Sequence, residues 1–417
     1  MKRAALEYLY GLERFGIKLG LEVITTLLNT LGNPHQQYKS IHIAGTNGKG
    51  STAAFLAQIL IEAGYKVGLY TSPHLIQFNE RIKINGKDIS ELDLINLIAV
   101  IKEKAEKNNL QLTFFEFTTA LAFFYFAQQK IDVAVVETGM GGRLDVTNVI
   151  QPEVTIITNI SLDHQQYLGE TKEEIAAEKS GIIKDKAIVV TVEEDKEVLK
   201  IIEKKCMEKN AGLFLSDKAW PQEASLERQI FTVKGQEYTI HLLGEHQLQN
   251  AALAIKAASL LAERGLLISS YNIQEGFKKA YWPGRLEIIC NEPLVLVDCA
   301  HNLAGMQELA RFIRSLSRRK VLLLGIAADK QISEMVSVIA PLVEEIIISK
   351  GNYKPADPLI IALEARKYVT KVIIEPEPEK ALLTALSRLP TGAVLLVTGS
   401  IYFVGEILKY RGYFQSE

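Results

Sequence analysis

A short glycine-rich stretch carries the clearest chemical signal in this sequence. It reads Gly-Thr-Asn-Gly-Lys-Gly-Ser over Gly45–Ser51, and it separates a β-like run from a helical pattern. Glycine lets the backbone come close to an anion, and successive N–H groups at the start of a helix attract phosphate. Lys49 would reach the terminal phosphates of a nucleotide, and the hydroxyl of Ser51 or Thr52 could contact phosphate or Mg²⁺.

The match to a standard P-loop is incomplete. Ile43 stands where the first glycine of that motif is expected, and Gly50 stands where a hydroxyl should directly follow Lys49. The alternative is a strand-to-helix turn that binds no ligand. Three glycines around one lysine at a strand end make that alternative the weaker one, so we predict a phosphate loop.

Three further polar residues follow apolar runs, where open α/β sheets bind their ligands. Ser72 lies in a Thr-Ser-Pro-His segment, Glu137 directly follows a run of valines, and His164 ends a Ser-Leu-Asp-His segment. Taken singly, each has an ordinary explanation: a turn cap, a solvated strand end and a surface histidine. Taken together around a phosphate loop, they favour Mg²⁺–ATP chemistry. Histidine is not a preferred Mg²⁺ ligand, so the pattern alone does not assign His164 to a metal.

The order of the predicted elements indicates an α/β fold with two domains. β-rich runs alternate with longer helical patterns, as in parallel sheets with crossover helices. In the first part we expect strands at 41–44, 66–70, 132–137 and 153–159, helices at 52–63 and from Thr171 towards Lys179, and a hairpin at 229–243 turning at Gly235. In the second part we expect strands at 294–297, 321–324, 345–349, 371–374 and 393–397, with helices at 303–316 and 379–389. We predict a P-loop ATPase-like, mostly parallel sheet domain over residues 1–291 and a smaller, Rossmann-like open α/β domain over 292–417.

Composition and charge exclude several classes of protein. The chain has 417 residues, with 47 Lys and Arg against 49 Asp and Glu. That balance provides no general field for nucleic acid or an anionic membrane, so we expect neither as a partner. Cys206, Cys290 and Cys299 form neither a metal-ligand spacing nor a disulfide framework. Because we find no apolar run long enough to span a bilayer and no secretory signal, we expect a cytoplasmic protein.

Taken in order, the motifs resemble the folylpolyglutamate synthase and dihydrofolate synthase family, bacterial bifunctional type, of the Mur-ligase superfamily of ATP-dependent amide ligases. The resemblance rests on FGIKLGLE at 15–22, LGNP at 31–34, GTNGKGS at 45–51, TSPH at 71–74, ETGMGGRLDVTN at 137–148, SLDH at 161–164, EKSGIIK at 178–184, HQLQNAALA at 246–254, WPGRLE at 282–287, DCAHN at 298–302 and TGSIYFVGE at 398–406. These segments extend over almost the whole chain. One position departs from the family pattern, because Cys299 replaces the usual glycine.

The resemblance also implies which residues form the site. Those that would hold ATP are Thr46, Asn47, Gly48, Lys49, Gly50, Ser51, Asn250, Arg285 and Asp298. Those that would hold Mg²⁺ are Ser72, Glu137 and His164. Those that would carry catalysis are Lys49, Lys179, His301 and Asp298. Lys179 stands where the family has a carbamylated lysine, although its spacing alone indicates a solvated helix residue. The resemblance leaves room for a monovalent cation as well.

The implied reaction joins L-glutamate to the carboxylate of a folate or a dihydropteroate. ATP would convert that carboxylate into an acyl phosphate, which the glutamate amine attacks. The partners would be small molecules, and the chain would act as a monomer. The motifs do not decide between dihydrofolate synthase, folylpolyglutamate synthase and both. The alternatives are a Mur-type peptidoglycan amino-acid ligase and a non-catalytic ATP-binding switch protein.

The acceptor pocket is less clearly marked. Phe78, Phe114, Phe115 and Tyr402 could stack on a pterin or aminobenzoyl ring, and Arg81 could supply a charge, but core packing explains the aromatic residues equally well. A site divided between two domains predicts a closing motion about residues 284–293, which would exclude water from an acyl phosphate.

Overall fold

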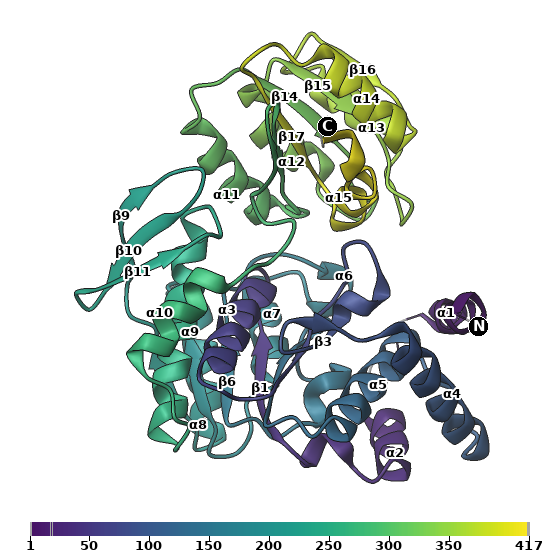
Figure 1. The fold of residues 1–417 in the computed structure, drawn as a ribbon, viewed down its shortest axis with the longest axis vertical. Helices are drawn as coiled ribbons and strands as arrows, with labels where there is room; N and C mark the ends of the chain where they lie inside the picture. Colours follow the sequence, from purple (N-terminus) through teal and green to yellow (C-terminus); the bar gives the residue numbers. More distant parts are fainter. Residues whose placement is uncertain (1, 17, 19, 415–417) are drawn as a thin grey trace.

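The computed structural model describes residues 2–16, 18 and 20–414. Positions 17 and 19 of the FGIKLGLE motif, and the outermost residues of the predicted domain ranges at 1 and 415–417, lie outside this description. Figure 1 shows a larger body formed by the purple-to-green part of the chain and a smaller one formed by the green-to-yellow part. The predicted α/β class with two sheet domains is confirmed.

Eight strands of the described chain form the first-domain sheet, in the order β4-β3-β2-β5-β1-β6-β7-β8. Their bounds are β1 (Lys39–Ala44), β2 (Val67–Tyr70), β3 (Ile82–Ile84), β4 (Lys87–Asp88), β5 (Val133–Glu137), β6 (Val154–Ile157), β7 (Ile188–Thr191) and β8 (Gly212–Leu215). Neighbouring strands run parallel except at the edge, where β3 pairs antiparallel with β2 and β4. The central strands are mostly apolar because helices cover both faces, as in β5, where Val135 packs on one side and Val136 on the other.

The covering helices hold this sheet between two cores. On one face, α3 (Lys49–Glu62), α9 (His246–Glu263) and α10 (Ser270–Lys279) pack together, and Phe55 meets Phe277 edge to face at 5.2 Å. On the other face lie α1 (Lys2–Gly11), α2 (Glu22–Thr30), α4 (Glu91–Lys107) and α5 (Phe114–Gln128). Near β7 and β8 lie α6 (Gln165–Leu168), α7 (Lys172–Ser180) and α8 (Lys196–Glu208). The predicted cap at Thr171 is present, with Glu174 completing a capping box at the start of α7.

A small antiparallel sheet interrupts the α/β alternation. Its strands are β9 (Trp220–Ala224), β10 (Gln229–Val233) and β11 (Gln236–Ile240). The predicted hairpin is confirmed, with Gly235 at a φ of +79° in the turn between β10 and β11. We did not predict β9, since its five residues are all exposed and include Pro221, so they show no apolar alternation.

The second domain contains a six-stranded sheet in the order β12-β13-β17-β14-β15-β16. The bounds are β12 (Glu287–Asn291), β13 (Leu294–Val297), β14 (Lys320–Leu324), β15 (Glu345–Ile348), β16 (Val372–Ile374) and β17 (Val394–Thr398). All five predicted strands are present. The sixth, β12, pairs antiparallel with β13, so this sheet starts at Glu287, four residues before the predicted boundary at 291.

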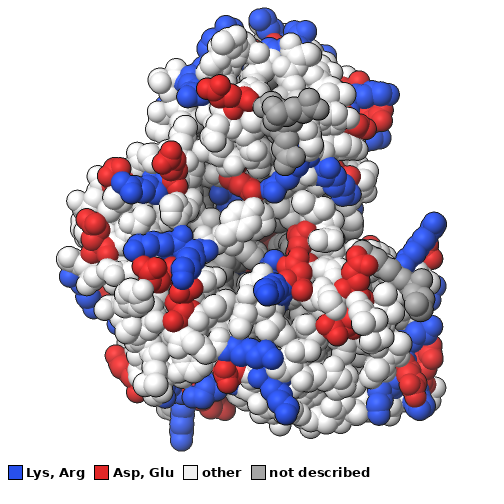
Figure 2. All heavy atoms as spheres, viewed as in Figure 1, with Lys and Arg blue, Asp and Glu red and all other residues white. Residues whose placement is uncertain are grey.

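Helices flank the second sheet as well. They are α11 (Leu303–Arg314), α12 (Ile332–Ile339), α13 (Pro358–Ala365), α14 (Pro378–Arg388) and α15 (Ile401–Leu408). Short 3₁₀ helices are η1 (Leu12–Phe15), η2 (Pro34–Gln36), η3 (Phe78–Arg81), η4 (Val146–Val149), η5 (Ala340–Leu342) and η6 (Arg411–Phe414). Among the residues described, no helix has both the length and the hydrophobicity needed to cross a membrane. Figure 2 shows acidic and basic side chains intermixed over the face in view, as the near-zero net charge leads one to expect.

Candidate active site between the two domains

A cavity of about 390 Å³ lies where the two domains meet, and residues of both line it. The first domain contributes the loop before α3, the segments after β2, β5 and β6, and the start of α9. The second domain contributes the segment after β13 and the first turns of α11. The residues that the resemblance assigned to ATP, metal or catalysis all line this one cavity, whereas Thr52, the alternative hydroxyl to Ser51, is buried and does not.

The phosphate loop is shaped by contacts that only glycine allows. Gly45 has a φ of +146°, and a Cβ there would stand 1.7 Å from the Thr158 hydroxyl oxygen. Gly48 has a φ of +86°, and a Cβ there would stand 2.3 Å from the side-chain oxygen of Asn250. Helix α3 begins at Lys49, three residues earlier than predicted, so its free N–H groups start directly in the loop. This arrangement is suited to binding phosphate.

Side chains from the segment after β6 hold the loop in place. The Thr46 hydroxyl donates to the carbonyl of Ser161 at 3.0 Å, and the backbone N–H of Asn47 donates to the side-chain oxygen of Asn159 at 3.0 Å. The Thr158 hydroxyl donates to the carbonyl of Asn47 at 2.7 Å. The loop is therefore fixed by its neighbours before any nucleotide arrives.

Lys49 lies inside this loop. Its Nζ donates to the carbonyls of Gly45 at 3.0 Å and Thr46 at 3.1 Å, and it stands 3.9 Å from Oε1 of Glu137. Only 16% of the Lys49 side chain is exposed, so its charge acts within a poorly solvated site. Such a cation is placed to face the phosphates of a nucleotide.

Of the three predicted metal ligands, Glu137 and Ser72 contact each other, whereas His164 stands apart from them. Glu137 is buried and accepts the backbone N–H of Ser72 at 3.3 Å. Burial raises the pKa of Glu137, against the lowering effects of Lys49, the Ser72 N–H and Arg285. His164 lines the same cavity but is exposed to solvent, so it is less enclosed than Glu137. No group of three His, Cys, Asp or Glu within the described residues could hold a metal by itself.

These donors nevertheless fit Mg²⁺. Mg²⁺ is usually bound by one or two carboxylates together with substrate phosphates and water, and not by an all-protein cage. The carboxylate of Glu137 and the hydroxyl of Ser72 supply hard oxygen atoms next to the phosphate loop. His164 is adjacent in the cavity, but the structure gives it no contact with either of them.

Lys179 is not the solvated helix residue that its spacing suggested. It is 4% exposed on α7, and its Nζ donates to the carbonyl of Gly45 at 2.8 Å. Burial, followed by the nearby charge of Lys49, lowers the pKa of Lys179 to about 7. The amine is therefore substantially neutral near physiological pH, as a reactive lysine must be.

The second wall of the cavity consists of single side chains. Asp298 is buried and accepts the backbone N–H groups of Leu286 at 2.9 Å and Ala300 at 2.8 Å. Burial raises the pKa of Asp298, while Arg285 and these N–H groups oppose that shift. Arg285 and Asn250 line the cavity, and the Asn250 amide donates to the side chain of Gln247 at 2.9 Å.

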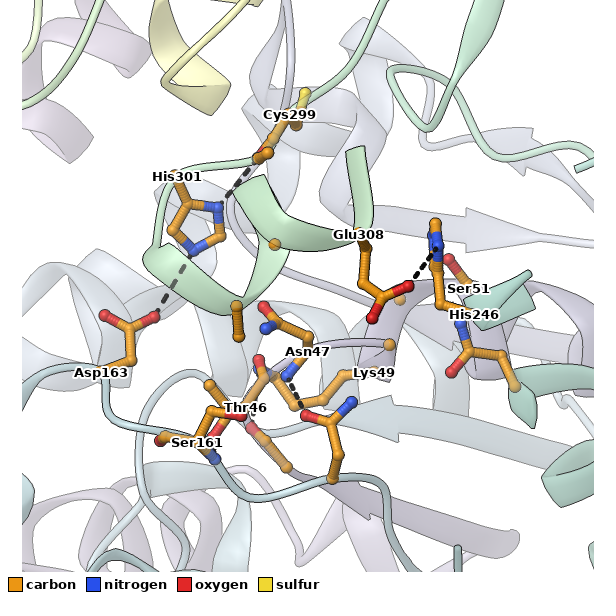
Figure 3. A pocket seen from close by; sticks show the side chains of 18 of the residues that line it. Thr46, Asn47, Lys49, Ser51, Ser161, Asp163, His246, Cys299, His301 and Glu308 are labelled. Atoms are coloured by element: carbon orange, nitrogen blue, oxygen red, sulfur yellow. Dashed lines mark hydrogen bonds and ion pairs between the residues drawn. The ribbon is translucent and has the colours of Figure 1, made fainter. Parts of the chain in front are cut away.

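His301 faces the first domain across the cavity (Figure 3). Its Nδ1 is 2.9 Å from the carbonyl of Cys299, and its Nε2 is 3.6 Å from Oδ2 of Asp163. The carboxylate of Asp163 also accepts the amide of Asn302 at 2.9 Å and Nζ of Lys330 at 2.8 Å. Burial by itself would raise the pKa of Asp163, but His301, His164 and Lys330 outweigh burial and hold that pKa well below its usual range.

Sequence reasoning missed Asp163, Asn302 and Lys330 as site residues. Asp163 stands directly before His164 in SLDH, and Asn302 ends the DCAHN segment, so their motifs could have pointed to them. Lys330 belongs to none of the motifs that we compared, and only the fold brings it to Asp163.

The candidate acceptor residues form a partial cluster near the cavity. The Arg81 guanidinium lies 5.2 Å from the ring centre of Phe114 and 5.9 Å from that of Phe78, and its Nε donates to Nδ1 of His74. Phe115 packs against Gly139 and stacks with Tyr70. Tyr402 belongs to the second domain, where it packs on Tyr353 at 4.4 Å.

Cys299 is accommodated by the segment that links the domains. Its Sγ lies 2.7 Å from the place where a Cβ on Gly284 would stand, and Gly284 has a φ of +72°. The N–H of Cys299 donates to the carbonyl of Gly284 at 2.9 Å. Burial raises the pKa of the Cys299 thiol to about 12, so this sulfur is an inert packing group.

Comparison with known proteins agrees with this site. Residues 43–258 match the Mur ligase middle domain, and residues 284–401 match the Mur ligase glutamate ligase domain. The fold and the shared cavity thus define an ATP-dependent, ADP-forming ligase of the Mur type.

The relatives narrow that class. The dihydrofolate synthase/folylpolyglutamate synthase of Bacillus subtilis (strain 168) is 37% identical over 422 residues, covering 97% of this chain and 98% of the relative. The crystal structure of folylpolyglutamate synthase from Thermotoga maritima has a TM-score of 0.86 at 34% identity and covers 100% of this chain and 98% of its own. Mycobacterium tuberculosis folylpolyglutamate synthase complexed with ADP has a TM-score of 0.89 at 31% identity and covers 99% of each chain. The chain belongs to the folylpolyglutamate synthase and dihydrofolate synthase family.

Membership of this family distinguishes between the functions that the sequence analysis left open. Glutamate ligation driven by ATP is confirmed, and the resemblance read from the motifs is correct. The relatives favour the folate-type ligases over the peptidoglycan ligase and the non-catalytic switch that the sequence left open.

Proposed function

We propose that this chain adds L-glutamate both to dihydropteroate and to folates, in one cavity. The observation that carries the proposal is that the phosphate loop of the first domain and the Asp298–His301 segment of the second line the same cavity of about 390 Å³. A nucleotide, an acceptor carboxylate and an amine can be brought together only in such a shared space. The two activities in the name of the Bacillus subtilis relative support the dual assignment.

The reaction requires activation of a carboxylate, which is a poor electrophile because its oxygen leaves reluctantly. Transfer of the γ-phosphoryl group from ATP to the carboxylate gives an acyl phosphate and ADP. The glutamate amine then attacks the acyl carbon, and inorganic phosphate leaves as the amide forms. Lys49 and Arg285 would stabilise the charge on the phosphoryl oxygens. His301 or Asp298 would orient the amine and accept its proton.

We assign Mg²⁺ binding to Glu137 and Ser72, with His164 close by. When bound, Mg²⁺ would neutralise phosphate charge during phosphoryl transfer. The support is the buried carboxylate of Glu137, which accepts the backbone N–H of Ser72 and lies beside Lys49, so that the Ser72 hydroxyl belongs to the same part of the cavity. Nζ of Lys49 lies 3.9 Å from Oε1 of Glu137 and offsets part of its charge.

We infer that Lys179 is carbamylated. Carbamate formation needs a neutral amine that attacks CO₂ and then loses a proton, and burial of Lys179 provides a pKa of about 7. Carbon-13 NMR of the protein in ¹³C-bicarbonate should show one carbamate signal that disappears in Lys179→Arg. Persistence of the signal in that variant would reject the assignment.

We also infer a monomer that works in the cytoplasm. Both walls of the cavity come from one chain, so no second copy is needed to complete the site. Within the described residues, Cys206, Cys290 and Cys299 form no disulfide, which agrees with a reducing compartment. Light scattering of the purified protein tests the first inference, and cell fractionation tests the second.

The acceptor range is tested by phosphate release with ATP, Mg²⁺ and L-glutamate. Dihydropteroate and tetrahydrofolate are supplied separately, and products are identified by mass spectrometry. Each acceptor should stimulate phosphate release only when glutamate is present. Stimulation by one acceptor alone would reduce the proposal to a single activity, and stimulation by neither would overturn it. Lys49→Ala should abolish turnover, whereas Lys200→Ala, at an exposed position on α8, should leave it unchanged.

A further inference from the structure

One buried carboxylate links the two domains at the edge of the cavity. Asp163 follows β6 in the first domain, where its Oδ1 accepts the backbone N–H of His164 at 2.9 Å. Its two side-chain donors come from the second domain: Oδ1 accepts Nζ of Lys330 at 2.8 Å, and Oδ2 accepts the amide of Asn302 at 2.9 Å. Nε2 of His301 lies 3.6 Å from Oδ2. The side chains of Asp163 and Lys330 are only 9% and 11% exposed.

The same carboxylate is connected to the phosphate loop. The Asn302 amide, besides donating to Asp163, donates to the side-chain oxygen of Asn47 at 3.1 Å and accepts the Asn47 amide at 3.3 Å. Asn302 is also the N-cap of α11, where its side chain accepts the backbone N–H of Gly305 at 2.8 Å. Position 163 therefore joins the phosphate loop, the start of α11 and His301 in one network.

The charges in this network depend on the domains being together. When the domains meet, Asp163 loses most of its contact with water, and a buried carboxylate is unfavourable without a cationic partner. Lys330 lies in the loop between β14 and α12 and brings a full positive charge directly to it. When the domains separate, Asp163 is hydrated and needs no partner. Lys330 thus stabilises the closed arrangement, in which the two domains meet, more than the open arrangement, in which they are separated.

We propose that Lys330 is a positioning residue that, by pairing with Asp163, holds the domains closed with His301 facing the phosphate loop and so couples ATP cleavage to amide formation. The proposal rests on the ligase reaction described above. Lys330 does not line the cavity, so it acts through Asp163 and not on the substrates.

Coupling means here that each ATP cleaved yields one amide product, and it is measured as ADP formed per glutamate incorporated. If the amine attacks the acyl phosphate, the products are the amide and inorganic phosphate. If water attacks in its place, the carboxylate is regenerated and phosphate is released, so ATP is consumed without product. A cavity that opens too readily admits water and raises the amount of ADP formed per glutamate incorporated. Loss of folded enzyme alone lowers ADP formation and glutamate incorporation together, so the ratio of the two stays the same.

The test compares wild type with Lys330→Met, Lys330→Gln and Lys330→Arg. ADP and labelled glutamate in product are measured in the same reaction. Both neutral variants should raise the KM for glutamate about tenfold and form more ADP than product, since the closed form retains an unpaired carboxylate. Lys330→Arg should restore coupling. Lys367→Met, which removes an exposed ion pair on the same domain, is the matched control and should behave as wild type.

A double variant separates charge from shape. In Asp163→Asn with Lys330→Met no buried charge is left unpaired, so coupling should be closer to wild type than in Lys330→Met alone.

Small-angle scattering supplies a readout that needs no turnover: Lys330→Met should have a larger radius of gyration than wild type and Lys330→Arg. Wild-type coupling together with unchanged compactness in both neutral variants would overturn the proposal. A wild type without glutamate-dependent ADP formation would instead refute the proposed function, and scattering would still decide the role of Lys330.

Discussion

The two walls of the cavity are built in different ways. The first-domain wall combines the segments after β2, β5 and β6 and the start of α9 with a glycine-rich loop whose shape depends on the glycines at 45 and 48. The second-domain wall consists of the segment after β13 and the first turns of α11, where the side chains of Asp298 and His301 are each held by a few hydrogen bonds. A preformed backbone surface binds by its shape, whereas isolated side chains act only when closure places them. We therefore expect substitutions in the first wall to abolish nucleotide binding and those in the second to reduce turnover.

The largest effect should follow from Gly45→Ala. The new Cβ would overlap the Thr158 hydroxyl, and the φ of +146° is unfavourable for alanine, so the loop must rearrange. ATP affinity, measured by calorimetry, should fall by about a thousandfold. Gly64→Ala is the matched control, because Gly64 also has a positive φ, +88°, but no atom within 4 Å of its Cβ position. Wild-type ATP affinity in Gly45→Ala would show that the loop shape does not matter.

For His301→Ala we expect a smaller effect, which falls on turnover and not on ATP affinity. This change removes a side chain of the second wall and leaves the phosphate loop intact, so kcat should fall by about a hundredfold with ATP affinity nearly unchanged. Steady-state kinetics and calorimetry on the same preparation test both parts. His241→Ala, at an exposed position directly after β11, should leave both quantities at the wild-type level. Equal losses of affinity and turnover in His301→Ala would erase the distinction between the walls.

Acid should weaken the first domain through its buried histidines. His42 on β1 is fully buried beside Thr147, and burial lowers the pKa of His42 from 6.5 to about 3. Because the folded pKa is depressed, protonation opposes folding: the stability is fully present above pH 6.5 and is lost as the pH falls towards 3, by at most about 1.4 kcal/mol per pH unit. Urea unfolding at several pH values should show this slope, and His42→Asn should reduce it. An unchanged slope would exclude His42 as its source.

The smallest effect is expected for Cys299→Gly, which introduces the residue that the motif resemblance leads one to expect at this position. The thiol fills space against Gly284 and is not reactive, so its removal should lower the free energy of unfolding by about 1 kcal/mol. Ligation should stay within about twofold of wild type. Thermal unfolding and the ligation assay measure these two quantities. A loss of activity comparable with that of His301→Ala would mean that the sulfur shapes the second wall.

The elements that sequence patterns located were those with strong local signals. Strands buried on both faces appear as continuous apolar runs, and all five strands predicted for the second sheet are present. Strands β9 and β12 were not predicted because β9 is exposed throughout and β12 is only partly buried at an edge of its sheet. Strands β3, β4, β7 and β8 were not predicted either, although β7 is a short and largely buried apolar run. The burial of Lys179 was likewise invisible, since a lysine on a polar helix pattern gives no sign of being covered.

The sequence alone determined the phosphate loop, because the glycines, Lys49 and the start of α3 lie within a few residues and their chemistry depends on local backbone geometry. It also determined the family, through ordered motifs along the chain. Only the tertiary structure decided which distant groups meet. Asp163 and Lys330 are 167 positions apart, and no local pattern relates them. Their pairing follows from the way the two sheets face each other, because a buried carboxylate and a buried ammonium are stable only when the fold brings them together.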